Sequence, residues 1–191
     1  MSKADIRRLD LDLPPGKEPI IVQVLAMLQD SRRRTIESIK GVSDEALNWR
    51  RSSAESSIAD LLYHIALVEA DWLYEDVAGV PYPKKIKALF PQEMRESDSR
   101  LVHVVPAPLD VHLHRLDDVR TELLEMFRTM SLEEFRRVRD LPRYDVTPEW
   151  ILHHLLQHEA EHRGQIKSLR KEAERRAEYR PAESRGVGDA K

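Results

Sequence analysis

Apolar residues that recur every three or four positions constrain this chain most, because that spacing places them on one face of an α-helix. Four segments show the pattern, at about residues 19–40, 57–79, 109–130 and 147–176. Charged residues make up 34% of the chain, and only 6 of its 191 residues are glycine. This balance favours amphipathic helices over a turn-rich sheet. The sequence therefore predicts an all-α fold.

The residues of these four apolar stripes are the predicted buried faces of four long helices. In chain order they are Ile21, Leu25, Leu28, Ile36 and Ile39; Ile58, Leu61, Ile65, Val68 and Trp72; Leu109, Leu113, Leu116, Leu123, Phe127 and Met130; and Ile151, Leu155, Ile166 and Leu169. Ser57 and Thr147 stand where N-caps are expected, with Pro148 at the first helical position. Ser131 and Glu134 predict a capping box that opens a short helical turn.

The connection between the second and third helices, residues 80–107, contains four prolines. It therefore has little room for regular helix, and a loop of this length is often a crossover or the wall of a site. Four long helices with one long connection are typical of a four-helix bundle. We expect one domain at 19–176, an extended N-terminal segment at 1–18 and a disordered tail at 177–191.

Composition excludes several classes of function. The net charge is -3, so no overall positive field attracts nucleic acid. No signal peptide and no apolar run of about 18 residues is visible, which predicts a cytoplasmic protein outside the membrane. Cysteine is absent, so any metal must be bound by histidines and carboxylates.

Histidines on the predicted buried faces are the strongest functional signal. In HHLLQHEAEHRGQI, at residues 153–166, helical steps from Ile151 place His158 and His162 on the buried seam. They lie about 40° apart around the helix and about 6 Å apart along it, so both rings can reach one point. His64 lies within the apolar stripe of the second helix. Three buried imidazoles are costly unless a divalent metal binds their nitrogens, and three protein ligands leave a coordination position open for chemistry.

The remaining polar and aromatic residues near these segments have simpler expected roles. His154, one turn before His158, is an expected outer-shell partner, whereas His153 points away. His112 is predicted to be a hydrogen-bonded core or boundary residue. Ser31–Arg34 are expected on a solvated helix face, and Gly164 is expected at a close contact between helices. Arg163 and Gln165 are expected to bind an acidic ligand or to cap a neighbouring helix. Trp72, Trp150 and Tyr63 are expected in core or boundary packing.

His158, Glu159 and His162 also match the H-E-x-x-H pattern of zinc proteases. A metzincin would place glycine three residues after the second histidine and a further histidine beyond it, whereas here Gly164 is two residues on and no histidine follows. The later glutamates lie on the same helix and cannot fold back as a third ligand. The zinc hydrolase is therefore the weakest alternative, and Glu159 is expected to be an outer-shell or surface carboxylate.

The segments SIADLLYHIALVEADWL and HEAEHRGQI together resemble the DinB-like (DinB/YfiT) superfamily of four-helix bundles. Its usual marks are L-x-x-H-I-A-x-x-E-x-x-W on the second helix and H-x-x-H-H-R-G-Q-I on the last. The resemblance extends over roughly residues 20–169. Glu161 stands where the family usually has another histidine, at a position that is not normally a ligand. The resemblance implies that His64, His158 and His162 bind a divalent metal.

The same resemblance implies a transferase or related enzyme that activates a low-molecular-weight thiol at the metal, with an electrophile as second substrate. Zinc is the expected metal, and nickel, cobalt or iron would also suit three imidazoles. Two alternatives remain open: a non-enzymatic, stress-associated bundle that its metal stabilises, and a metal-free bundle that binds a small ligand. A homodimer is expected from the general frequency of such assemblies.

Overall fold

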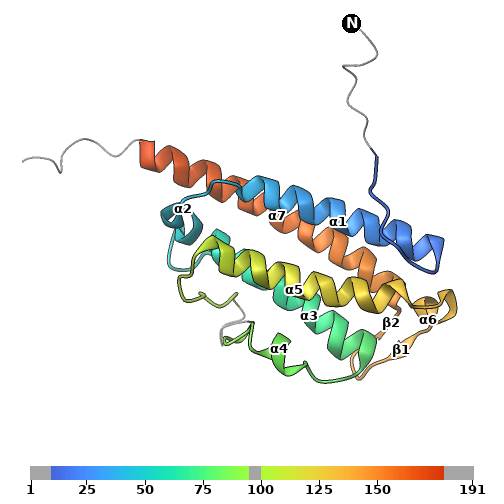
Figure 1. The fold of residues 1–191 in the computed structure, drawn as a ribbon. Coiled ribbons are helices and arrows are strands. Elements are labelled where there is room, and N and C mark those ends of the chain that lie inside the picture. Colours follow the sequence, from blue (N-terminus) through green and yellow to red (C-terminus); the bar gives the residue numbers. More distant parts are fainter. Residues whose placement is uncertain (1–9, 95–99, 179–191) are drawn as a thin grey trace, which may run out of the picture.

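The computed structural model describes residues 10–94 and 100–178, and its core is a bundle of four long helices. These are α1 (Pro19–Ile39), α3 (Ile58–Asp71), α5 (Leu109–Arg128) and α7 (Pro148–Glu178). In Figure 1, α1 and α7 run in one direction and α3 and α5 in the other. The connection after α3 therefore crosses back along the bundle. The predicted all-α four-helix bundle is confirmed.

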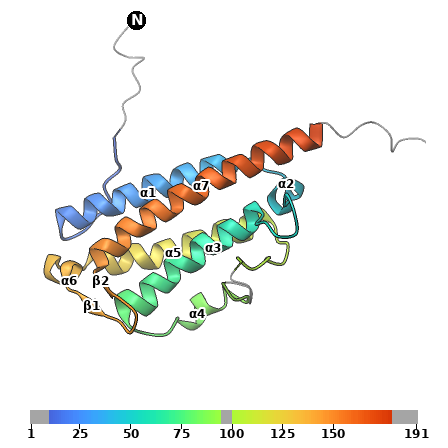
Figure 2. The same cartoon turned by 180° about the vertical axis from the view of Figure 1, so that it is seen from behind.

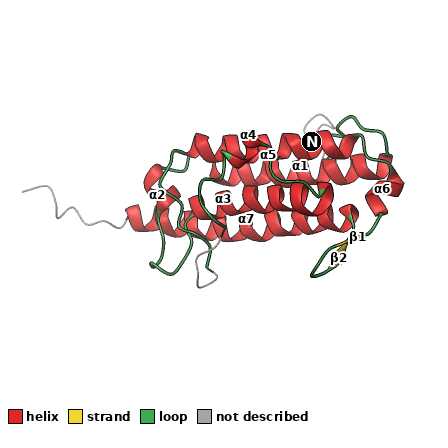
Figure 3. Ribbon diagram, turned by 90° about the horizontal axis from the view of Figure 1, so that it is seen from below, coloured by secondary structure: helices red, strands yellow, loops and turns green. Residues whose placement is uncertain are grey.

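Shorter elements lie at the ends and along one side of this bundle (Figure 2). They are α2 (Asp44–Asn48), the π-helix η2 (Trp72–Ala78), α4 (Lys84–Lys87), α6 (Leu132–Arg136), and the strands β1 (Arg139–Asp140) and β2 (Asp145–Val146). The strands form an antiparallel pair with Arg139 opposite Val146. Helices dominate the described residues (Figure 3). The sequence patterns predicted neither this hairpin nor the π-helical end of α3.

Local signals account for most helix ends. Ser57 and Asp60 form the capping box of α3, in which each side chain accepts a hydrogen bond from the other residue's backbone N–H. The Thr147 hydroxyl accepts from Trp150 N at 3.2 Å at the start of α7. Ser131 caps α6 through Glu134 N, although the Glu134 carboxylate itself binds Arg137. The predicted N-caps are therefore correct.

The described residues leave part of the domain prediction open. Residues 10–17 contain no helix or strand, while 1–9 and 179–191 lie outside the described part of the chain. α7 continues to Glu178, two residues beyond the predicted end of the domain. No helix among residues 10–94 and 100–178 is long and apolar enough to cross a membrane.

Three expectations about helix faces were wrong. Ile36 is 41% exposed, so the apolar stripe of α1 does not include it. Ser31 and Arg32 are buried, while only Arg33 and Arg34 lie on the solvated face, where both bind Asp30. A Cβ built on Gly164 meets no atom within 4 Å, so no close helix contact requires a glycine there.

Candidate metal centre

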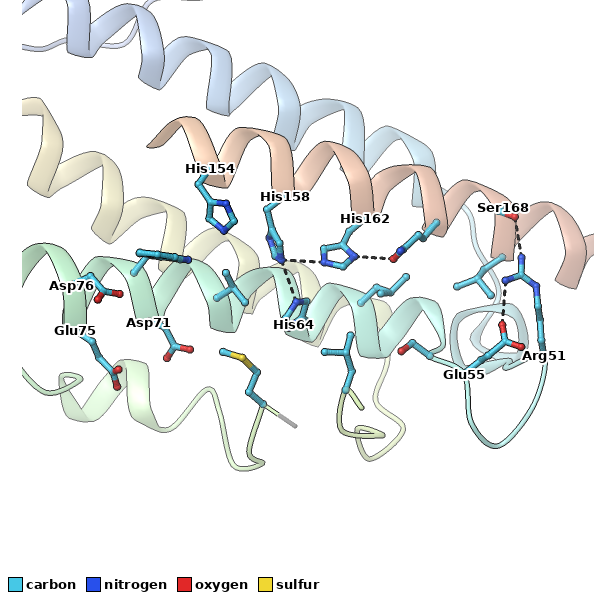
Figure 4. Close-up of a pocket in the computed structure, with 18 of the residues that line it drawn as sticks. Arg51, Glu55, His64, Asp71, Glu75, Asp76, His154, His158, His162 and Ser168 are labelled. Atoms are coloured by element: carbon cyan, nitrogen blue, oxygen red, sulfur yellow. Dashed lines mark hydrogen bonds and ion pairs between the residues drawn. The ribbon is translucent and has the colours of Figure 1, made fainter. Parts of the chain in front are cut away.

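A cleft of about 840 Å³ lies between α3 and α7, and the segment that follows α4 borders it (Figure 4). His64 enters it from α3, and His154, His158 and His162 enter it from successive turns of α7. The α3–α7 contact is direct. The two helices that the sequence singled out for their inward histidines therefore face each other across one cavity.

The three predicted ligands converge within this cleft. His158 Nε2 lies 3.1 Å from His64 Nε2 and 3.0 Å from His162 Nε2. One ligand nitrogen from each ring lies within 4.8 Å of the others. His64 is buried at 6% exposure, and the other two are half-buried. The residues that the sequence indicated, 94 positions apart, thus meet at one point.

The spacing of these nitrogens fits a divalent cation. Zinc–imidazole bonds of about 2.0–2.1 Å in tetrahedral geometry place the nitrogen atoms about 3.3 Å apart. The observed separations of 3.0 and 3.1 Å need to widen by only a few tenths of an ångström to reach that value. The third pair, His64 and His162, lies within the 4.8 Å limit that encloses all three nitrogens.

Gln165 orients one of the three ligands. Its side-chain oxygen, Oε1, lies 2.8 Å from His162 Nδ1. An amide oxygen accepts hydrogen bonds, so His162 Nδ1 is the protonated nitrogen and Nε2 presents its lone pair to the cleft. The sequence predicts that Gln165 flanks the site and binds an acidic ligand or caps a neighbouring helix, whereas in the structure it contacts His162. The contact with a side chain three residues earlier is a geometry that helical spacing allows.

Burial keeps the central histidine neutral. It lowers the pKa of His158 to about 3, and the neighbouring imidazoles of His162 and His154 act in the same direction. A neutral imidazole is the form that binds metals, so His158 does not need to lose a proton at neutral pH. Burial also lowers the pKa of His154.

Carboxylates line the α3 side of the cleft at one end. Asp71, Glu75 and Asp76 lie there, as Figure 4 shows. Burial raises the pKa of Asp71 to about 6, and Tyr82 donates a hydrogen bond to its carboxylate. These residues were not predicted as part of the site. Asp71 follows His64 by seven positions, which is two helical turns, so the same face of the helix already pointed to it.

At the other end of the cleft, glutamates neutralise the guanidinium of Arg51. Arg51 donates to Glu172 at 2.6 Å and to Glu55 at 3.3 Å, and it also reaches the hydroxyl of Ser168 at 2.9 Å. Glu172, one of the glutamates that follow the H-E-x-x-H pattern on α7, thus belongs to an ion pair with Arg51. Arg51 is therefore paired with glutamates, while Asp71, Glu75 and Asp76 line the opposite end of the cleft.

Aromatic rings enclose the cleft beside the carboxylates. His154 stacks on Trp150, with ring planes 4° apart and centroids 5.1 Å apart, and Trp72 lies against both rings. The contact of His154 with His158 is a ring contact with centroids 5.8 Å apart rather than the expected orienting hydrogen bond. Trp150 is 49% exposed, so it packs at the surface, whereas Tyr63 is in the core as predicted.

Glu159 does not face the histidine cluster as a catalytic base. It is 1% exposed, and its two carboxylate oxygens accept from Arg32 at 2.8 Å and Arg120 at 3.0 Å. Burial opposes its charged form, but the two guanidinium groups outweigh that effect and hold its pKa below the ordinary value. Glu159 was expected to be an outer-shell or surface carboxylate, and its burial contradicts the surface position. Because both of its oxygens bind arginines, it is not available as the general base of an H-E-x-x-H hydrolase.

Two further predicted residues have structural contacts. Arg163 donates to the backbone and side-chain oxygens of Ser31 at 3.0 and 2.9 Å, which links α7 to α1. His112 is in the core, as predicted, with Nδ1 3.2 Å from Arg115, while its Nε2 has no hydrogen-bond partner among the described residues.

The helical bundle agrees with comparisons to known proteins. The family model of the DinB superfamily matches residues 27–166, and the chain belongs to this superfamily. Among individual relatives, the uncharacterized protein YuaE of Bacillus subtilis is 27% identical in a 161-residue alignment that covers 79% of this chain and 99% of YuaE.

Two other matches are more limited. A CTP synthase from Archaeoglobus fulgidus is 36% identical over 77 residues, but these are 40% of this chain and only 14% of the synthase. The crystal structure of a DinB-like protein, YjoA from Bacillus subtilis, superposes with a TM-score of 0.51 at 18% identity and covers 78% of this chain and 91% of that one. At that identity the superposition supports the fold alone.

Proposed function

We propose that the protein is a divalent-metal-dependent transferase that activates a low-molecular-weight thiol at His64, His158 and His162. The observation that carries the proposal is the convergence of three imidazole nitrogens within 4.8 Å of one another inside an open cleft. Three protein ligands leave room for a further ligand, as in catalytic rather than structural metal sites. Membership of the DinB superfamily supports the same interpretation.

The chain's own residues bind the metal and shape the space around it. His64, His158 and His162 supply one ligand nitrogen each, and Gln165 contacts the other ring nitrogen of His162. When bound, a divalent cation supplies a Lewis acid that lowers the pKa of a thiol, so that thiolate is available at neutral pH. The cleft of about 840 Å³ has the size of a small-molecule site. It therefore has room for a small thiol and an electrophile together.

The reaction class follows from the nucleophile. The thiolate sulfur forms a bond to an electrophilic atom of the second substrate, the leaving group departs with the electron pair of its bond, and the thiol proton passes to solvent. We propose zinc as the metal, because three imidazoles suit it well, although the same ligands accept nickel, cobalt and iron.

A thiol titration of cobalt-substituted protein tests this function. We expect the visible absorption of bound cobalt to change saturably with a biological thiol such as glutathione, mycothiol or bacillithiol, and a thiolate charge-transfer band to appear. His158→Ala should abolish this response. His153→Ala is the matched control, since His153 lies on the same helix but is exposed and outside the cleft.

Two results would contradict the proposed activity. If cobalt binds at the three histidines and no thiol changes its spectrum, the thiol-dependent reaction is wrong, and the metal-stabilised bundle without enzymatic activity becomes the better account. If His158→Ala responds to thiol as the wild type does, the thiol binds elsewhere.

A further inference from the structure

A closed ring of four charged side chains lies in the bundle core, and each long helix contributes one member. The members are Arg32 from α1, Glu69 from α3, Arg120 from α5 and Glu159 from α7. All four are between 1% and 6% exposed. We call these residues the core ring. It lies at the boundary between the two apolar clusters of the core.

Cations and anions alternate around the core ring. Glu69 accepts from Arg32 at 2.7 Å and from Arg120 at 2.6 and 2.9 Å. Glu159 accepts from Arg32 at 2.8 Å and from Arg120 at 3.0 Å. Each glutamate therefore joins the same two arginines, and the formal charges cancel.

One further guanidinium nitrogen of each arginine attaches the core ring to the backbone. Arg32 Nη1 donates to Leu116 O at 2.7 Å, and Arg120 Nη1 donates to Leu28 O at 2.8 Å. Each arginine thus holds the main chain of the helix that supplies the other arginine. The core ring consequently fixes α1 against α5 as well as α3 against α7.

Stability alone gives little reason for such a ring. Removing four charges from water costs about as much as their mutual attraction returns, and apolar replacements of buried ion pairs are often neutral or stabilising. Hydrogen bonds of this kind are directional, however, whereas apolar contacts tolerate small rotations and shifts of a helix. A buried ring therefore specifies one relative rotation of the four helices.

The two glutamates lie next to the metal-binding histidines in the chain. Glu159 directly follows His158, and Glu69 follows His64 by five positions, so each histidine sits at a set angle around its helix from a glutamate. A rotation of about 10° moves an atom about 5–6 Å from a helix axis by about 1 Å. Metal ligands must be held to within about 0.5 Å. By holding the two glutamates in place, the core ring therefore determines where the imidazoles meet.

We propose that the core ring positions the histidine cluster, with Glu69 and Glu159 as positioning residues for His64, His158 and His162. This inference rests on the metal binding in the proposed function, but not on the thiol reaction. In this account the core ring maintains the geometry of the site rather than the stability of the fold. The two properties can therefore be separated by mutation.

A variant with an apolar ring makes that separation. In Arg32→Met/Glu69→Leu/Arg120→Met/Glu159→Leu, we expect the urea midpoint of the metal-free protein to be unchanged or higher. We expect the Kd for Co²⁺, measured by competition with a chelator, to rise about 10-fold or more, as it does when groups that orient metal ligands are lost. The absorption spectrum of bound cobalt should also change. A stable variant that binds Co²⁺ within about twofold of wild type would overturn the proposal.

If the apolar variant does not fold, single substitutions test whether the core ring positions the histidines. Glu159→Gln is compared with Leu25→Ala, a core change in α1, which contributes no ligand. Both are measured at a temperature where each is fully folded. We expect Glu159→Gln to weaken Co²⁺ binding well beyond Leu25→Ala at equal or smaller loss of stability. Equal effects of the two changes on Co²⁺ affinity would show that the core ring acts only through stability.

A readout without metal separates failure of this inference from failure of the proposed function. A crystal structure of metal-free Glu159→Gln shows the three imidazoles directly. We expect the contact of His158 Nε2 on α7 with His64 Nε2 on α3, 3.1 Å in the wild-type chain, to be lost, whereas the 3.0 Å contact of His158 with His162 lies within α7 and should persist. If the contact between His158 and His64 persists, the core ring does not position the cluster, whether or not the wild type binds metal or responds to thiol.

Discussion

Among single residues, burial and neighbours decide what each histidine can do. His158 is half-buried and His112 is buried, and in both cases burial lowers the pKa, to about 3 and about 4 respectively. His158 has two further imidazole nitrogens within hydrogen-bonding distance. His112 instead lies beside Arg115, whose charge lowers its pKa further. The first histidine is placed to bind a cation, whereas the second is a neutral core residue.

His112 should make stability depend on pH. Its folded pKa of about 4 lies below the ordinary 6.5, so the unfolded chain binds more protons between these values. Stability that is fully present above pH 6.5 is then lost as the pH falls toward 4. We expect His112 to account for a loss of about 2 kcal/mol in the free energy of unfolding between pH 7 and 5.

Urea unfolding of metal-free wild type and His112→Gln at pH 7 and pH 5 measures this contribution. The variant should lose about 2 kcal/mol less than wild type over that interval, whatever its stability at pH 7. His114→Gln is the control, because His114 is an exposed histidine on the same helix. Identical pH dependence in His112→Gln and wild type would mean that His112 titrates normally in the folded chain.

At the scale of elements, one glycine lowers the helix propensity of α7. Gly164 lies in the middle of this 31-residue helix, and an added Cβ there meets no atom within 4 Å. Glycine in a helix interior costs about 0.5–1 kcal/mol relative to alanine. Gly164→Ala should therefore raise the free energy of unfolding by about that amount.

Denaturant unfolding compares Gly164→Ala with Gly41→Ala. Gly41 follows α1 with φ of 72°, where an L side chain is strained, so alanine there should destabilise the protein. A loss of stability in Gly164→Ala would contradict this prediction. It would mean that a close contact at this position requires glycine, although the structure shows no such contact.

The helices were predictable because their apolar stripes repeat over several turns. Short elements lack this repetition, which explains why the two-residue strands β1 and β2 and the π-helix η2 were missed. Arg32 and Glu159 were misread for a different reason. A periodicity argument assigns charged residues to solvent, and only the three-dimensional arrangement shows that the charges of separate helices pair in the core.

The inward orientation of the three candidate metal ligands was predictable from their positions around their helices. His158 and His162 fall on one seam, and His64 falls within another, so inward orientation followed from the sequence. The convergence of the three histidines did not follow from the sequence, because the position of a residue around its helix does not show which helices are neighbours. The resemblance to a known family supplied that link. The carboxylate end of the cleft was missed because Asp71 was not compared with the phase of His64.

For the whole molecule, the path of the chain brings α3 and α7 together. The crossover after α3 lets α5 run parallel to it, and α7 then returns beside α1 and α3 (Figure 1). His64 and His158 meet across this contact although 94 residues separate them. The histidine cluster is therefore a product of topology. A homodimer, a cytoplasmic location and the absence of nucleic-acid partners remain predictions.

Native mass spectrometry of untagged protein after addition of one equivalent of zinc tests the three-histidine centre most directly. We predict that the mass of the folded chain increases by one zinc ion, and that His64→Ala weakens retention of this ion about 10-fold or more while His153→Ala retains it. Equal zinc occupancy in His64→Ala and wild type, or no zinc on folded wild type, would contradict the account.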